Sequence, residues 1–176
     1  MSRCDRIALC IGLLAAIGWV VVYVRNPFHT PSWNPIARVF GVNVLRASTN
    51  SMEPTLEQGT IFIANSWPFV GKEPESGDVV TFWHSRDPKA QYVKRIVATG
   101  GDRIEMVRCT VRINGRELPE PYAIVRGPGP LNLCELDEVE IPMGNYFLLG
   151  DNRLNSEDSR IWGSLPRENI IGRVDD

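Results

Sequence analysis

Histidine is scarce in this chain of 176 residues, which contains only His29 and His84. Neither lies in a pattern typical of a catalytic triad, so a serine nucleophile would need a base other than imidazole. Positive charge is not in excess either, because the formal net charge is −2 and no long basic run is present. The composition therefore does not favour a histidine-dependent hydrolase, and it does not indicate nucleic acid as a partner.

Cysteine is sparse and is not spaced for metal binding. The chain has four cysteines, Cys4, Cys10, Cys109 and Cys134, with no Cys-x-x-Cys pair and no adjacent histidine. This pattern argues against zinc, and we expect neither a metal nor another cofactor. Cys109 and Cys134 lie in the downstream part of the chain. They form a disulfide if that part faces an oxidising compartment, and two unpaired thiols are the alternative.

The N-terminal region contains an uncharged apolar run, Ile7–Val24. Its length is near the lower limit for a helix that crosses a bilayer. Arg3 and Arg6 precede the run, which weakly favours a cytoplasmic N-terminus. The run ends in valines before Arg25, unlike the small residues at which a targeting segment is removed. We expect residues 1–6 to be cytoplasmic and residues 7–24 to form an uncleaved transmembrane anchor.

The rest of the chain is predicted to be a linker and one mainly β domain. Residues 25–38 are rich in proline, which opposes helix formation, and are predicted to be a juxtamembrane linker. Residues 39–176 show no long helical period. Asn114-Gly115 predicts a type I′ hairpin, because both turn residues need positive φ. The predicted strands are Phe40–Leu45, Thr60–Ala64, Val79–Trp83, Tyr92–Ala98, Thr110–Ile113, Arg116–Leu118, Val139–Ile141, Tyr146–Leu149 and Ile170–Val174, with a loop at Pro119–Asn132.

Three segments of the predicted domain could carry chemistry. They are Ser51-Met-Glu-Pro-Thr, Tyr92-Val-Lys-Arg-Ile-Val and Gly150-Asp-Asn-Arg-Leu-Asn-Ser-Glu-Asp-Ser-Arg. Taken singly, a serine in a proline-containing turn is more often a capping residue than a nucleophile. In this order, and after a membrane anchor, the three segments resemble the bacterial type I signal peptidases, which are serine endopeptidases with a Ser/Lys dyad.

The resemblance implies a signal-peptidase-like catalytic β domain with defined roles for four side chains. Ser51 matches the nucleophile, and Lys94 matches the general base. Ser156 matches a serine that orients the lysine. Thr49 stands where the family has a hydroxyl that forms the oxyanion hole with the Ser51 N–H.

The resemblance further implies a set of residues around this centre. Two ion pairs should brace the site, Asp151 with Arg95 and Asp158 with Arg160. The substrate pocket should be lined by Ala47, Met52, Leu56, Tyr92 and Val93.

A lysine can act as a base only if its amine is largely neutral. A free lysine has a pKa of about 10.4 and is protonated at neutral pH, whereas burial can lower that value by ~3–5 units. The apolar neighbours Val93 and Ile96 can supply such surroundings for Lys94. If this segment is a strand, Arg95 points to the opposite face and can pair with a carboxylate there.

By this resemblance the protein is expected to be a membrane-bound endopeptidase that cleaves signal peptides from exported preproteins. Its expected partners are signal peptides and the lipid bilayer. Its expected location is the bacterial cytoplasmic membrane, with a single pass and the catalytic domain on the extracytoplasmic side. Two alternatives stay open: a specialised relative that processes a pilin or conjugative-transfer protein, and a non-catalytic membrane-tethered β module. A self-cleaving Ser/Lys repressor is disfavoured, because it should carry a DNA-binding segment and no anchor.

Overall fold

The computed structural model describes residues 3–28, 35–84, 87–126 and 131–174. The chain divides into two compact units, Met1–Asn43 and Val44–Asp176. This boundary lies a few residues after the predicted end of the linker at residue 38. Residues 29–34, which belong to the predicted linker, lie outside the described residues.

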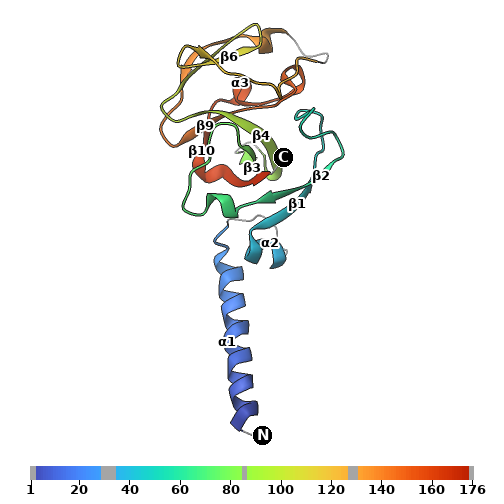
Figure 1. Cartoon of the computed structure of the whole chain (residues 1–176), viewed down its shortest axis with the longest axis vertical. Helices are drawn as coiled ribbons and strands as arrows, with labels where there is room; N and C mark the ends of the chain where they lie inside the picture. Colours follow the sequence, from blue (N-terminus) through green and yellow to red (C-terminus); the bar gives the residue numbers. More distant parts are fainter. Residues whose placement is uncertain (1–2, 29–34, 85–86, 127–130, 175–176) are drawn as a thin grey trace. The chain divides into compact units, whose positions relative to one another are not determined.

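The first unit contains a long apolar helix and a short one (Figure 1). Helix α1 (Arg3–Arg25) includes a segment of 19 residues, Ile7–Arg25, that is long and apolar enough to cross a membrane. The mean hydropathy of this segment is 2.6. Helix α2 (Pro35–Phe40) begins at a proline, where the missing N–H costs no helical hydrogen bond. The Phe40 ring contacts Trp19 of α1, with ring centroids 5.5 Å apart.

The start of the first predicted strand is wrong. Phe40 ends helix α2, and Gly41 follows with φ of 64°, a left-handed conformation that glycine adopts readily at a helix end. The strand β1 (Val42–Arg46) begins only after this glycine.

The second unit is built from two antiparallel sheets, which confirms the mainly β prediction. The larger sheet has the order β1-β2-β11-β3-β4-β9-β10, and the smaller has the order β7-β6-β5-β8. Figure 1 shows β6 of the smaller sheet and β1–β2 of the larger sheet at opposite ends of this unit. The remaining strands are β2 (Ile61–Asn65), β3 (Val79–His84), β4 (Asp87–Thr99), β5 (Arg103–Val107), β6 (Thr110–Ile113), β7 (Arg116–Glu117), β8 (Leu136–Glu140), β9 (Asn145–Leu149), β10 (Leu165–Pro166) and β11 (Ile170–Val174).

Short helical turns connect several of these strands. They are the 3₁₀ turns η1 (Trp67–Phe69), η2 (Leu131–Cys134), η3 (Arg153–Asn155) and η4 (Arg167–Asn169), together with the helix α3 (Ser159–Trp162). The predicted hairpin between β6 and β7 is confirmed, because Asn114 and Gly115 have φ of 53° and 75°. Two strands, β5 and β10, were not predicted.

The buried side chains form three clusters, and one of them lies directly beneath the first chemical segment. That cluster contains Ala47, Met52, Leu56, Phe62, Ala64, Val79 and Val174. A second cluster joins the two sheets through residues such as Val97, Ile104 and Phe147. The strand β4 is central to the arrangement, because it pairs with β3 on one side and β9 on the other.

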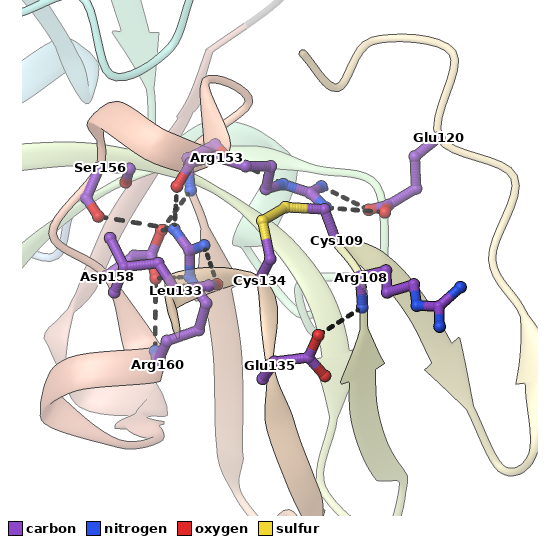
Figure 2. Close-up of a disulfide and its surroundings, with 11 residues drawn as sticks. Arg108, Cys109, Glu120, Leu133, Cys134, Glu135, Arg153, Ser156, Asp158 and Arg160 are labelled. Atoms are coloured by element: carbon purple, nitrogen blue, oxygen red, sulfur yellow. Dashed lines mark hydrogen bonds and ion pairs between the residues drawn. A yellow bond between two sulfur atoms is a disulfide. The ribbon is translucent and has the colours of Figure 1, made fainter. Parts of the chain in front are cut away.

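A disulfide joins Cys109, in the turn between β5 and β6, to Cys134 at the end of η2 (Figure 2). The Cys109 N–H also donates a hydrogen bond to the Cys134 carbonyl oxygen at 2.9 Å. The sequence left open whether these cysteines form a disulfide or are two unpaired thiols, and the structure has the disulfide.

Candidate active site

Ser51 lies in a buried turn that follows β1. The Glu53 N–H donates to the Asn50 carbonyl oxygen at 3.2 Å, and the Leu56 N–H donates to the Met52 carbonyl oxygen at 2.8 Å. Met52 is 1% exposed and Leu56 is buried in the cluster below the turn. These two apolar side chains fix the turn to the core, because moving them would expose apolar surface to water.

Lys94 is within hydrogen-bond distance of Ser51. Its Nζ lies 2.7 Å from the Ser51 Oγ and also donates to the Val93 carbonyl oxygen at 2.9 Å. Lys94 sits in the middle of β4, opposite Val80 of β3, and is only 5% exposed. These two residues are 43 positions apart in the sequence, and the fold of the β unit brings them into contact.

Burial lowers the pKa of Lys94 to about 8, because desolvation penalises the ammonium. The carboxylates of Asp158 and Asp151 act in the opposite direction, and the guanidinium of Arg160 acts in the same direction as burial. The net effect leaves far more of the amine neutral near pH 7 than in a free lysine. A neutral amine 2.7 Å from a hydroxyl oxygen can accept its proton.

The Thr49 hydroxyl also lies at the Ser51 oxygen. Its Oγ1 donates to the Ser51 Oγ at 3.1 Å, and the Ser51 N–H donates to the same Thr49 oxygen at 3.5 Å. The hydroxyl and the backbone N–H therefore lie on one side of the nucleophile candidate, where an oxyanion would form.

Ser156 is close to this centre but does not have the predicted bonding. Its Oγ is buried and has no hydrogen-bond partner among the described residues, and the lysine amine bonds to the Val93 carbonyl oxygen in addition to Ser51. Ser156 packs against Gly150, where an added Cβ would overlap the Ser156 hydroxyl and lie 2.6 Å from the Ser51 carbonyl oxygen. Glycine at position 150 is thus required for the two segments to approach.

The first predicted ion pair, Asp151 with Arg95, is present and fully buried. The Arg95 Nε and Nη2 donate to the two carboxylate oxygens at 3.0 and 2.9 Å. Thr55, in the turn after Ser51, donates to the same carboxylate at 2.6 Å. The Asn152 N–H donates to the Ser51 carbonyl oxygen at 3.1 Å. The segment after β9 is therefore held against the Ser51 turn by both side-chain and backbone bonds.

The second predicted pair, Asp158 with Arg160, is also present (Figure 2). Two Arg160 nitrogens donate to the two Asp158 oxygens, each at 2.7 Å. Asp158 in turn accepts from the Gly150 N–H at 3.0 Å, and Arg160 donates to the Leu133 carbonyl oxygen at 2.7 Å. This pair closes the Gly150–Arg160 loop and connects it to η2, which carries the disulfide.

A pocket of about 250 Å³ opens beside Ser51 and Lys94. Four of the five predicted pocket residues, Ala47, Met52, Tyr92 and Val93, line it. Leu56, which was also predicted to line the pocket, is not among these lining residues and packs into the cluster below the turn. Most of its lining residues come from β1 with the segment after it and from β4.

The family model for signal peptidase, peptidase S26, matches residues 34–175. The chain belongs to this signal peptidase family. Among its relatives, a probable signal peptidase I-2 of Synechocystis sp. is 35% identical over 142 residues, which cover 78% of this chain and 63% of the relative. The signal peptidase I of Bacillus amyloliquefaciens is 39% identical over 128 residues, or 69% of this chain and 65% of the relative.

The fold of this signal peptidase family member also matches a solved structure. A crystal structure of a signal peptidase I from Enterococcus faecalis V583 is similar with a TM-score of 0.50 and 28% identity. The match covers 59% of this chain and 98% of the other. This chain spans 63–65% of the length of the Synechocystis and Bacillus relatives.

The structure of this family member adds a third buried ion pair, which the sequence did not predict. Two Arg153 nitrogens donate to the carboxylate of Glu120 at 2.8 and 2.6 Å (Figure 2). Arg153 is fully buried, and Glu120 lies in the Pro- and Gly-rich loop after β7. Tyr122 of the same loop covers the Arg95 guanidinium, 4.0 Å from its ring centroid. No local pattern at Glu120 indicates this pairing, because its partner is 33 residues away.

Within residues 3–28, 35–84, 87–126 and 131–174, no group of three or more His, Cys, Asp or Glu side chains could hold a metal ion. Two acidic residues of the Gly150–Arg160 loop, Asp151 and Asp158, are paired with arginines.

Proposed function

We propose that this protein is a membrane-anchored serine endopeptidase that removes signal peptides from exported preproteins with a Ser51/Lys94 dyad. The observation that carries the proposal is the 2.7 Å contact between the Lys94 Nζ and the Ser51 Oγ in a buried site. Membership of the signal peptidase family supports the same conclusion. The anchor is α1, and the proposed peptidase domain follows the linker, from residue 39 onwards.

The proposed reaction begins with proton transfer from the Ser51 hydroxyl to the neutral Lys94 amine. The serine oxygen attacks the scissile carbonyl carbon, and the carbonyl oxygen becomes an oxyanion. Hydrogen bonds from the Ser51 N–H and the Thr49 hydroxyl stabilise this charge. The Lys94 ammonium then protonates the leaving amine, and an ester between Ser51 and the signal peptide remains. In the second half, Lys94 accepts a proton from water, which hydrolyses the ester and restores Ser51.

The proposed roles of the flanking residues follow from their positions. The ion pairs Asp151–Arg95 and Asp158–Arg160 hold the Gly150–Arg160 loop against the Ser51 turn. The hydroxyl of Ser156 is buried beside this turn. In the complex with substrate, this hydroxyl would orient the lysine amine in place of the Val93 carbonyl oxygen. The pocket lined by Ala47, Met52, Tyr92 and Val93 would receive the small side chains that precede the scissile bond.

The test is cleavage of a purified preprotein by the purified full chain in detergent. We expect the wild type to release a single signal peptide and Ser51→Ala to release none above background, because the nucleophile is absent. Circular dichroism should show the same β content in both proteins. Equal cleavage by the folded Ser51→Ala variant would refute the proposal.

A further inference from the structure

A second, aromatic pocket adjoins the cleft that holds Ser51 and Lys94. It has a volume of about 100 Å³ and is lined by Phe82, His84, Tyr92, Glu157 and Trp162. Tyr92 also lines the first pocket, so the two pockets share a wall. The charge of Glu157 slightly opposes the lowering of the Lys94 pKa by burial, so this carboxylate is within electrostatic reach of the dyad.

Three separate elements bring the rings of this aromatic pocket together. Phe82 and His84 come from the end of β3, Tyr92 from β4 and Trp162 from α3. The Phe82 ring, 1% exposed, lies 5.9 Å from the Tyr92 ring and 5.8 Å from the Trp162 ring. The His84 ring lies 4.9 Å from Trp162 in an edge-to-face arrangement. Because the rings pack on one another, the walls exist before any ligand binds.

Glu157 adds a carboxylate to this aromatic pocket. Its side chain is exposed, and it makes no ion pair with the described residues, in contrast to its neighbour Asp158. Aromatic faces attract cations, with Trp the strongest and Tyr following it. A carboxylate beside these faces adds attraction for a cation and repels an anion. A neutral aliphatic side chain would gain only apolar contact there.

We propose that the aromatic pocket binds a basic side chain, lysine or arginine, of the polypeptide substrate. It therefore acts as a second specificity determinant beside the pocket for small side chains. The flexible apolar stem of the basic residue lies along Tyr92 and Trp162, and its charged head reaches Glu157. This inference rests on the proposed peptidase function, since it concerns the substrate of the same site.

The first experiment uses the purified full chain and a series of peptides that share one cleavage site. At each position outside the small residues beside the scissile bond, arginine, methionine and glutamate are placed in turn. At the position that reaches the aromatic pocket, we expect kcat/KM for arginine to exceed that for methionine by about 3- to 30-fold. Glutamate should be the poorest of the three. Equal kcat/KM values for the three residues at every position would overturn the inference.

The second experiment changes the pocket itself. Glu157→Gln should reduce the arginine-to-methionine ratio roughly threefold or more, and Glu157→Lys should make glutamate the preferred residue. The ratio is taken within one variant, so that any change in Lys94 affects both peptides equally. Trp162→Leu should lower the same ratio by removing an aromatic wall. The matched control is Glu117→Gln, which removes a carboxylate from the exposed strand β7 and should keep the wild-type ratio.

The outcomes separate this inference from the proposed function. If the wild type cleaves no peptide, or if Ser51→Ala cleaves as well as the wild type, the proposed function fails and the inference fails with it. If cleavage depends on Ser51 but the ratio is the same in Glu157→Gln, Glu157→Lys and the wild type, only the pocket assignment is overturned. A reversed preference in Glu157→Lys supports the assignment directly, because folding defects cannot reverse a preference.

Discussion

Lys94 is a buried residue whose positive charge is disfavoured by its surroundings. Desolvation opposes its ammonium form, while Asp158 and Asp151 favour it. Both carboxylates are already bound to arginines, Asp158 to Arg160 and Asp151 to Arg95. These pairs moderate the attraction between the carboxylates and Lys94, because an adjacent guanidinium offsets the carboxylate charge. The site therefore contains two buried aspartates and still has a lysine pKa near 8.

The activity should follow the ionisation of this lysine. Because the neutral amine is the proposed base, kcat/KM should rise about tenfold per pH unit below the pKa of about 8 and level off above it. Lys94→Arg retains a positive charge but cannot lose its proton in this range, so cleavage should fall to background. The measurement is peptide cleavage as a function of pH. Near-wild-type cleavage by folded Lys94→Arg would eliminate the Ser/Lys mechanism.

The pH dependence of stability should also reflect Lys94. Its contribution rises with pH, whereas the contribution of a surface lysine that gains an acidic partner falls with pH. The pKa of Lys94 falls from 10.5 to about 8 on folding, so the unfolded chain binds more protons between these two values. Stability therefore rises with pH across this interval and is lowest below about 8. Lys94→Met removes the buried charge and should be more stable than the wild type near pH 6, by on the order of 2 kcal/mol.

Urea unfolding of the wild type and Lys94→Met near pH 6 and near pH 10 measures this effect. The difference between the two proteins should shrink at the higher pH, where the wild-type amine is neutral in the folded state. Lys72→Met is the control, because Lys72 is exposed and its replacement should change stability little at either pH. A wild type that is more stable than Lys94→Met near pH 6 would contradict the predicted cost of burial.

At the scale of elements, local patterns predicted the strands that have clear turn signals or compact apolar runs. The hairpin at Asn114-Gly115 was predictable because its turn requires positive φ at both residues. The strand β5 was not predicted, although its residues alternate between buried and exposed, with Ile104 and Met106 buried. The strand β10 has only two residues, too few for a periodic pattern, and its identity as a strand depends on pairing with β9.

The residues of the candidate site that lie in sequence motifs could be predicted. Contacts between segments that are distant in the sequence could not. Ser51, Lys94, Asp151 and Asp158 were identified because their motifs resemble those of one family. The sequence does not indicate whether Leu56 faces the pocket or the core, and the structure has it in the cluster below the turn. The Glu120–Arg153 pair was missed because Glu120 lies in an irregular loop, and only the tertiary fold brings it to Arg153.

The disulfide links the turn between β5 and β6 to η2, which contacts the Gly150–Arg160 loop. Cys134 follows Leu133, whose carbonyl oxygen accepts a hydrogen bond from Arg160. Replacing Cys109 and Cys134 with serine removes a crosslink between residues 25 positions apart, and such a crosslink typically stabilises a protein by about 3 kcal/mol. We expect Tm to fall by roughly 5–10 °C, with a smaller loss of activity because the ion pairs stay in place. The measurement is thermal unfolding, with and without reductant.

The appropriate background for this comparison is Cys4→Ser with Cys10→Ser, so that no other thiol is present. Reductant should lower Tm in this background to the value of the Cys109→Ser/Cys134→Ser variant and should not change that variant further. The contrary result is a Tm that is identical with and without the crosslink. In that case the disulfide contributes nothing to the stability of the domain.

At the scale of the whole molecule, the chain combines an apolar helix with a β unit that carries a disulfide. Disulfides persist in oxidising compartments and are rare in the bacterial cytoplasm. The arginines at positions 3 and 6 precede the apolar run, and positive residues favour the cytoplasmic side of a membrane. These two observations are independent of each other, and both support a β unit outside the cytoplasm.

The corresponding prediction concerns orientation. In spheroplasts that express the chain with an N-terminal tag, added protease should degrade the β unit and leave a short tagged fragment that contains α1. This result is expected because the membrane protects only the helix and the few residues before it. A cytoplasmic marker should stay intact in the same sample, and lysis before protease treatment should remove the tagged fragment as well. A full-length chain that survives in intact spheroplasts and is digested only after lysis would place the β unit in the cytoplasm and contradict the predicted orientation.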